Sequence, residues 1–310
     1  MATTSLLLPP KPDTIVHNER WDAERDPLNA TESFETYRTY LFSIAYRMLG
    51  SAMDAEDMLQ ETYLRYQAVP PESINSLKAY LTTILTRLCI DQLHLAYKQR
   101  ETYLGPWLPE PVLTSSTGFP DVEEAAVMHE SLSLAFLTML EQLQPAERAV
   151  FILREVFDYD YADIAAFVGR KEAACRQLFS RARKHLAESE HRNEVPAGLQ
   201  QQLLTGFIQA VQAGDQTALM ELLTADARLV ADAGGKIPSA ATRPILGSQA
   251  ITQFAIGVKL SFLAKGYTIE LAEVNYQPAV ILRAGGQALV VFTIEVEDKR
   301  VKTVRFMANP

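Results

Sequence analysis

The sequence has few of the residues that mark disulfide-rich or metal-binding proteins. Only two of its 310 residues are cysteines, Cys89 and Cys175, and they do not form a C-x-x-C pair. This number and spacing argue against a disulfide framework and against a cysteine metal site. We therefore expect two core thiols, no metal and no cofactor.

A long apolar run is also missing. The first apolar stretch, residues 6–8, is broken by Pro9 and Pro10. No later stretch approaches the roughly 20 apolar residues that a membrane span needs. We expect a cytoplasmic protein that does not act at a membrane.

Positive charge is scarce as well. Lys and Arg total 29 against 38 for Asp and Glu, so the formal net charge is −9. This balance excludes a protein that coats nucleic acid through its overall charge, because such binding needs an excess of cations. Any contact with DNA must come from a local basic surface.

Apolar periodicity divides the chain into segments. We expect a flexible tail at 1–30, and then a bundle of three helices at 31–103, which Gly50 and Pro70 help to delimit. Residues 104–128 are rich in proline, yet Trp107 and Leu108 are too apolar for a free linker, so this segment should dock on the protein.

Two further domains are expected after this linker. Residues 129–190 have helical periodicity with a turn at 159–161 and Gly169 between two short helices, which is typical of a helix-turn-helix. Residues 199–310 begin with two helices and continue with strands, the first at 228–231. Helices followed by an antiparallel meander indicate an α+β domain.

The second helix of the bundle has a strongly acidic face. Ser51 can cap this helix while the carboxylate of Asp54 reaches back to complete a capping box. Acidic groups three and four residues apart share one side of a helix. Alone, such a pattern is more often a solvated surface than a binding site. The residues concerned are Asp54, Glu56, Asp57, Gln60 and Glu61.

The segment 170–186 reverses the charge of the rest of the chain, with six Arg or Lys and one Glu. An apolar stripe that includes Cys175 and Leu186 faces inward, so polar groups suited to the DNA major groove face outward. The alternative is a solvated basic helix. The outward residues are Lys171, Arg176, Gln177, Ser180, Arg181 and Lys184.

The stretches YRTYLFSIAYRMLGS and DAEDMLQETYLRY, within residues 37–66, resemble region 2 of the sigma-70 superfamily, and residues 140–186 resemble region 4. No region 3 separates them, which is typical of extracytoplasmic-function sigma factors. The resemblance implies that the acidic helix binds core RNA polymerase and that Asn75, Lys78 and Tyr80 contact the minus-10 promoter element. The basic helix would read the minus-35 element. Arg170 stands where many relatives have a Ser or Thr helix cap.

The segment TYLGPWLPEPV, residues 102–112, together with the C-terminal domain is similar to a subgroup of these factors with a fused SnoaL-like cone. In that subgroup the extension regulates the sigma regions in cis, without a separate anti-sigma partner. The resemblance implies an interdomain regulatory loop at Asp232, Gly234, Gly235 and Lys236. Ala233 replaces a usual glycine, and the sequence stops at Pro310, where relatives continue.

Other functions were weighed against this hypothesis. An enzyme in the cone would need an inward acid or base and an oxyanion donor, but no histidine follows His191. A small ligand in the cone is a second alternative. A one-component regulator would explain residues 140–310 but not the first bundle. The candidate groups for catalysis are Asp226, Asp232, Tyr267, Tyr276 and Glu295.

Overall fold

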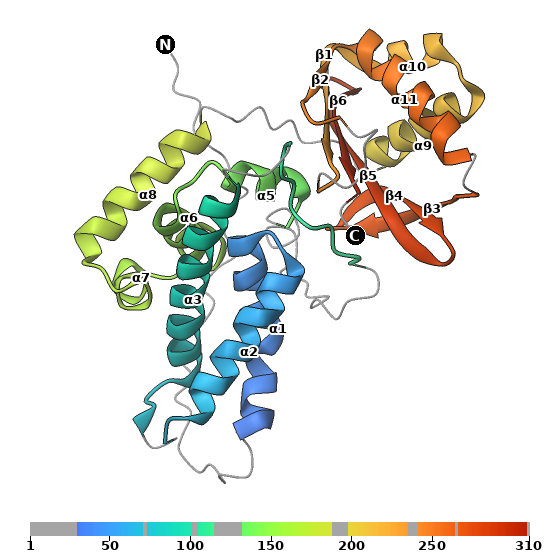
Figure 1. Cartoon of the computed structure of the whole chain (residues 1–310). Coiled ribbons are helices and arrows are strands. Elements are labelled where there is room, and N and C mark those ends of the chain that lie inside the picture. Colours follow the sequence, from blue (N-terminus) through green and yellow to red (C-terminus); the bar gives the residue numbers. More distant parts are fainter. Residues whose placement is uncertain are drawn as a thin grey trace, which may run out of the picture.

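The computed structural model describes residues 30–70, 73–100, 105–114, 132–187, 198–234, 241–263 and 266–308. It has a helical part and a C-terminal part in which helices and strands are combined (Figure 1). In the described ranges, no helix has the length and apolar character required to cross a bilayer. The expected tail at 1–29 lies outside the described residues.

The N-terminal bundle consists of α1 (Ala30–Leu49), α2 (Ala52–Gln67) and α3 (Leu77–Arg100). Gly50 follows α1 with a φ of +69°, a conformation that favours glycine. Ser51 then caps α2, because its side chain accepts a hydrogen bond from the backbone N–H of Asp54 at 3.2 Å. These elements confirm the three-helix bundle.

The second helical unit contains α5 (Leu134–Leu140), α6 (Pro145–Phe151), the π-helix η3 (Ile152–Val156), α7 (Tyr161–Val168) and α8 (Glu172–Ala187). Proline occupies the first turn of α6, where its missing N–H removes no helical hydrogen bond. Gly169 ends α7 in the left-handed conformation. The pair α7 and α8 forms the expected helix-turn-helix.

The two helical units share one hydrophobic core, which includes buried residues from α1, α3, α5 and α7. Polar contacts also join them. The Nε and Nη2 atoms of Arg148 in α6 donate to the carbonyl oxygen of Arg47 in α1 at 3.2 and 3.0 Å. Arg87 of α3 donates to the carbonyls of Phe167 and Ala166 at the end of α7, at 3.0 and 2.9 Å. The units therefore pack as one body.

The C-terminal domain contains α9 (Leu199–Ala213), α10 (Gln216–Leu222), β1 (Leu223–Asp232), β2 (Ile245–Leu246), α11 (Ser248–Leu263), β3 (Thr268–Val274), β4 (Gln277–Ala284), β5 (Gln287–Glu297) and β6 (Arg300–Met307). The strands form one sheet in the order β2-β1-β6-β5-β4-β3, and only β1 and β6 pair in parallel. The first strand extends well beyond the expected 228–231.

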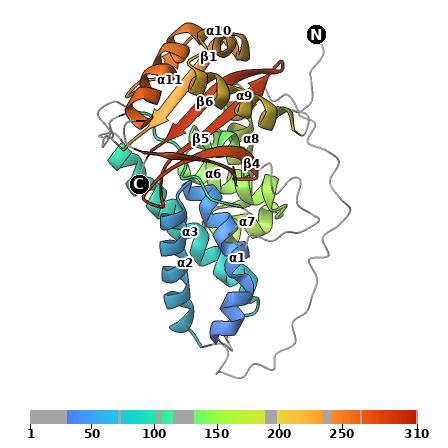
Figure 2. The same cartoon turned by 90° about the vertical axis from the view of Figure 1, so that its right-hand side faces the viewer.

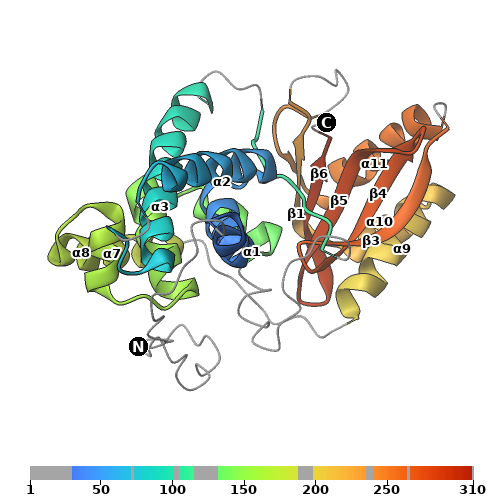
Figure 3. The same cartoon turned by 90° about the horizontal axis from the view of Figure 1, so that it is seen from below.

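The helices of this domain cover one face of the sheet, while the other face is turned toward the helical units (Figures 2 and 3). Apolar side chains such as Phe207 and Phe292 fill the space between helices and sheet, with ring centroids 5.4 Å apart. A smaller cluster lies on the opposite face and joins Leu108 and Leu134 to residues of the sheet. Two helical units and an α+β cone confirm the expected fold class.

Candidate functional sites

The acidic face of α2 is open to solvent. Asp57 and Gln60 are exposed, and two apolar side chains, Met53 and Leu64, extend the same line with 73% and 58% exposure. Residues at this spacing lie on one side of a helix. The result is a mixed acidic and apolar strip, a composition that suits a protein partner.

The other three acidic residues of α2 have partners inside the chain. The carboxylate of Asp54 accepts from the amide of Gln92 at 3.4 Å. Glu56 pairs with Arg38 at 2.5 Å, and Glu61 pairs with Arg65 at 2.8 Å. These pairs hold the carboxylates near the helix surface, so Asp57 is the member of the predicted set with the most accessible charge.

The start of α2 is completed by a residue that the sequence did not single out. The Oε2 atom of Glu110 accepts from the backbone N–H groups of Ala52 and Met53 at 2.7 and 3.3 Å, and from the hydroxyl of Ser51 at 3.1 Å. A negative charge there is favoured by the helix dipole. The Ser51 cap is confirmed, but the expectation that Asp54 closes a capping box is wrong, because its carboxylate accepts from Gln92.

The minus-10 candidates lie around the start of α3. Asn75 is exposed just before the helix. The ammonium of Lys78 lies 4.5 Å from the ring centroid of Tyr40, and burial lowers the pKa of Lys78. Tyr80 is half-buried against the shared core. Of the three candidates, Asn75 is the most exposed, while Lys78 and Tyr80 are partly buried against neighbouring side chains.

All six minus-35 candidates are exposed on or just before α8. Arg176 is ion-paired with Glu172, and its guanidinium lies 4.4 Å from the ring centroid of Tyr161. The backbone carbonyl of Lys171 accepts from the N–H groups of Ala174 and Cys175, which starts the helix without a side-chain hydroxyl. In Figures 1 and 3, α8 lies on the side of the helical units away from the C-terminal domain.

The proline-rich segment docks on the protein, as Trp107 and Leu108 led us to expect, and it contacts both the bundle and the C-terminal domain. Its described part, the linker segment 105–114, runs between the bundle and the sheet (Figure 3). A Cβ atom at Gly50 would lie 2.7 Å from the Trp107 ring, so the ring needs a glycine there. The backbone N–H of Leu108 donates to the buried carboxylate of Asp232 at 2.8 Å.

Asp232 thus contacts the linker segment, while Gly235 and Lys236 lie outside the described residues. The second carboxylate oxygen of Asp232 accepts from the N–H of Gly234 at 3.1 Å. Gly234 has a φ of +58°, whereas Ala233 is not among the residues with positive φ. The alanine therefore introduces no left-handed strain at this turn.

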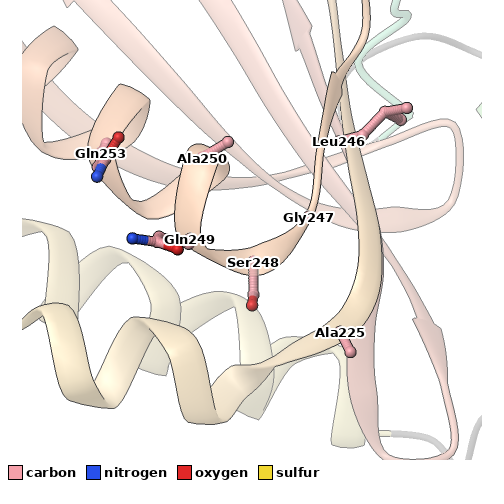
Figure 4. Close-up of a pocket in the computed structure, with 7 residues that line it drawn as sticks. All are labelled: Ala225, Leu246, Gly247, Ser248, Gln249, Ala250 and Gln253. Carbon is pink, nitrogen blue, oxygen red and sulfur yellow. The ribbon is translucent and has the colours of Figure 1, made fainter.

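The candidate groups for catalysis do not come together. Asp226 pairs with Lys302 at 2.6 Å and Glu295 with Arg305 at 2.6 Å, while Tyr276 lies at the junction with the helical units. None of them lines the pocket beside the start of α11 (Figure 4). Its lining has no ionisable side chain and consists of Ala225, Leu246, Gly247, Ser248, Gln249, Ala250 and Gln253.

Comparisons with known proteins agree with this organisation. Residues 33–100 match the family "Sigma-70 region 2", and residues 133–186 match "Sigma-70, region 4". The ECF RNA polymerase sigma factor SigJ of Mycobacterium tuberculosis is 38% identical over 226 residues, which are 73% of this chain and 72% of the relative. The probable ECF RNA polymerase sigma factor SigI of the same species is 34% identical over 203 residues, or 65% and 68% of the two chains.

A solved structure extends the likeness through the C-terminal domain. The crystal structure of Mycobacterium tuberculosis SigJ superimposes with a TM-score of 0.71 at 32% identity. The match covers 90% of this chain and 96% of that chain. The similarity therefore includes the sheet and its helices as well as the two helical units.

Proposed function

This chain belongs to the extracytoplasmic-function sigma factors of the sigma-70 family, and from that membership we propose which of its surfaces serve promoter recognition. It is a sigma factor of RNA polymerase, and its role in transcription initiation is not enzymatic. One observation carries the assignment of surfaces. The two helical units that match regions 2 and 4 each have an exposed face whose charge suits a different partner.

The α2 strip is the surface for core polymerase. It joins the charge of Asp57 to the exposed apolar groups of Met53 and Leu64. Interfaces combine an apolar centre with complementary charges, which steer association and fix the register. Asp54, Glu56 and Glu61 flank this strip and contribute negative potential, while Gln60 supplies an amide.

The two DNA-reading surfaces are separate. Asn75, Lys78 and Tyr80 meet the minus-10 element through hydrogen bonds and stacking with unpaired bases. The exposed face of α8 enters the major groove at the minus-35 element, where Arg pairs with guanine and Gln with adenine. Lys171, Ser180, Arg181 and Lys184 add contacts to phosphates or bases on the same face.

Simultaneous reading requires the two units to separate. The elements are centred about 25 base pairs apart, which is about 85 Å at 3.4 Å per base pair. A compact body of about 150 residues has a radius of gyration of about 15 Å and is therefore about 40 Å across. Units that share one core cannot span that distance. The packed arrangement is therefore a resting state. The C-terminal domain regulates the separation of regions 2 and 4 in cis, through contacts with the segment that links them, including the bond from Leu108 to Asp232.

A matched pair of charge reversals tests the polymerase surface. Asp57→Arg and Glu221→Arg change the net charge equally, and both residues are exposed. Asp57→Arg should weaken binding to core polymerase more than tenfold, while Glu221→Arg should bind as the wild type does. Both should unfold at the wild-type temperature, because single exposed charges contribute little to stability. Wild-type affinity of the Asp57→Arg protein, measured by fluorescence anisotropy, would reject this surface.

A further inference from the structure

The turn between β3 and β4 has an unusual location. Its two residues, Asn275 and Tyr276, have φ angles of 53° and 58°, as a type I′ hairpin turn requires. Hairpin turns of this type usually project into solvent. Here Asn275 has only 1% of its surface exposed, and the turn projects into the junction between the helical units and the linker segment.

Within the part of the chain that the structure describes, Asn275 makes four hydrogen bonds, all to residues outside its own domain. Its backbone N–H donates to the carbonyl of Val112 at 2.9 Å, and its side-chain oxygen accepts from the N–H of Val112 at 2.9 Å. Its side-chain nitrogen donates to the hydroxyl of Tyr46 at 2.7 Å and to the carbonyl of Leu132 at 2.8 Å. One amide group thus contacts α1, the linker segment and the chain just before α5.

The partners of Asn275 are themselves fixed. The hydroxyl of Tyr46 donates to the carbonyl of Glu110 at 2.6 Å, so its lone pairs are free to accept from Asn275. Burial raises the pKa of Tyr46, which keeps this hydroxyl protonated at neutral pH. The whole network is buried, where a polar group without its partner is costly.

Neighbouring residues strengthen the same contact. Leu113 forms an isolated antiparallel β-bridge with Val274, so the linker segment pairs with β3 at the edge of the sheet. The backbone N–H of Tyr276 donates to the hydroxyl of Thr114 at 3.1 Å, and the Tyr276 side chain packs against the core shared by the helical units. The turn is therefore held by backbone pairing, by the Asn275 amide and by apolar packing.

We propose that the turn formed by Asn275 and Tyr276 is the clasp by which the C-terminal domain holds region 2, region 4 and the linker segment at one point. Asp232, the residue that the sequence indicated, bonds to the linker segment through Leu108. Asn275 bonds to α1 of region 2, to the linker segment and to Leu132, the residue just before region 4. The inference deepens the proposed regulation in cis and rests on that proposal for its effect on transcription.

The clasp changes how the domains are arranged, and it covers neither Asp57 of the polymerase surface nor Gln177 of the minus-35 surface. Asp57 on α2 and Gln177 on α8 stay exposed while the turn is docked. The C-terminal domain lies across the junction, away from α8, as Figures 1 and 3 show from two directions. Release of the clasp frees the linker segment, so that regions 2 and 4 can separate.

Two glycine substitutions in the full chain test the clasp. Asn275→Gly removes the side chain while glycine keeps the positive φ, so the hairpin itself is preserved. Asp298→Gly is the matched control, because Asp298 and Lys299 form a second turn with φ of 49° and 61° that is exposed. Hydrogen exchange of the peptide that covers residues 105–114 is then measured in the free protein by mass spectrometry.

Asn275→Gly should make the linker amides exchange at least tenfold faster, since three side-chain hydrogen bonds across the junction are lost. Asp298→Gly should leave this peptide at the wild-type rate. Tyr46→Phe, which removes one partner hydroxyl, should accelerate the exchange less than Asn275→Gly does. Wild-type exchange in the Asn275→Gly protein would overturn the clasp. Because no polymerase is present, this result is independent of the assignment of the polymerase surface.

Discussion

Arg87 offers a direct way to loosen the resting arrangement of regions 2 and 4. This exposed side chain of α3 donates two hydrogen bonds to the last carbonyls of α7, at 3.0 and 2.9 Å. It also places a positive charge at the negative end of the α7 dipole, which contributes about 0.3–1 kcal/mol. Hydrogen bonds to a charged group contribute about 1.5–3 kcal/mol each, and exposure places these two well below that range.

Arg87→Ala should therefore weaken the packed arrangement by about 1–2 kcal/mol, or a factor of roughly 5–30 in the equilibrium with separated units. Neither unit should unfold, because the side chain lies outside the core. Fluorescent labels on cysteines introduced at the exposed positions Gln67 and Lys184 report the distance between α2 and α8, and both native cysteines are buried.

The expected result is a larger population of molecules with a long distance between the labels. Arg65→Ala is the control, because Arg65 is also exposed but pairs with Glu61 inside α2. An identical distance distribution in wild-type and Arg87→Ala proteins would refute the reasoning that this arginine joins the two units.

Two further predictions concern DNA reading and acid stability. Gln177→Ala should relax the base preference at one or two minus-35 positions, whereas Lys184→Ala should weaken binding to all DNA sequences alike and lower its salt dependence. Binding assays with a promoter library measure both effects. If both variants weakened binding to all sequences uniformly, α8 would contact phosphates only and would not read bases. In the C-terminal domain, burial raises the pKa of Glu295, but Arg305, Thr303 and Arg228 together outweigh burial and leave the pKa below its usual value of 4.5. The contribution of Glu295 to the free energy of unfolding should then be constant above about pH 5 and fall as the pH drops through the lowered pKa. Glu295→Gln should therefore flatten the acid-side fall in stability measured by urea titrations, and an unchanged slope would contradict the ion pair with Arg305.

The sequence was most informative where structure is decided locally. Gly50 ends α1 as its position predicts, and the apolar stripe of α8 leaves Gln177 and Lys184 exposed as the helical period requires. Such features depend on residues close in the chain, so periodicity and turn chemistry indicate them.

Contacts between distant segments could not be predicted in this way. Glu110 caps a helix that begins 58 residues earlier, and Asn275 bonds to a hydroxyl 229 residues away. Neither residue stands in a local pattern that distinguishes it from an ordinary linker glutamate or turn asparagine. Their roles arise only when the C-terminal domain and the bundle meet, whereas the family resemblance indicated the interdomain loop at 232–236.

Run-off transcription decides whether this chain acts with core polymerase to initiate transcription. Purified core RNA polymerase from the same bacterium is supplied with a genomic DNA library, with and without the full chain. We expect the chain to bind core polymerase and to produce transcripts from a defined set of start sites that share minus-35 and minus-10 elements. Binding of the chain to specific DNA without any gain in transcripts would contradict a sigma factor and would favour a regulator that acts alone.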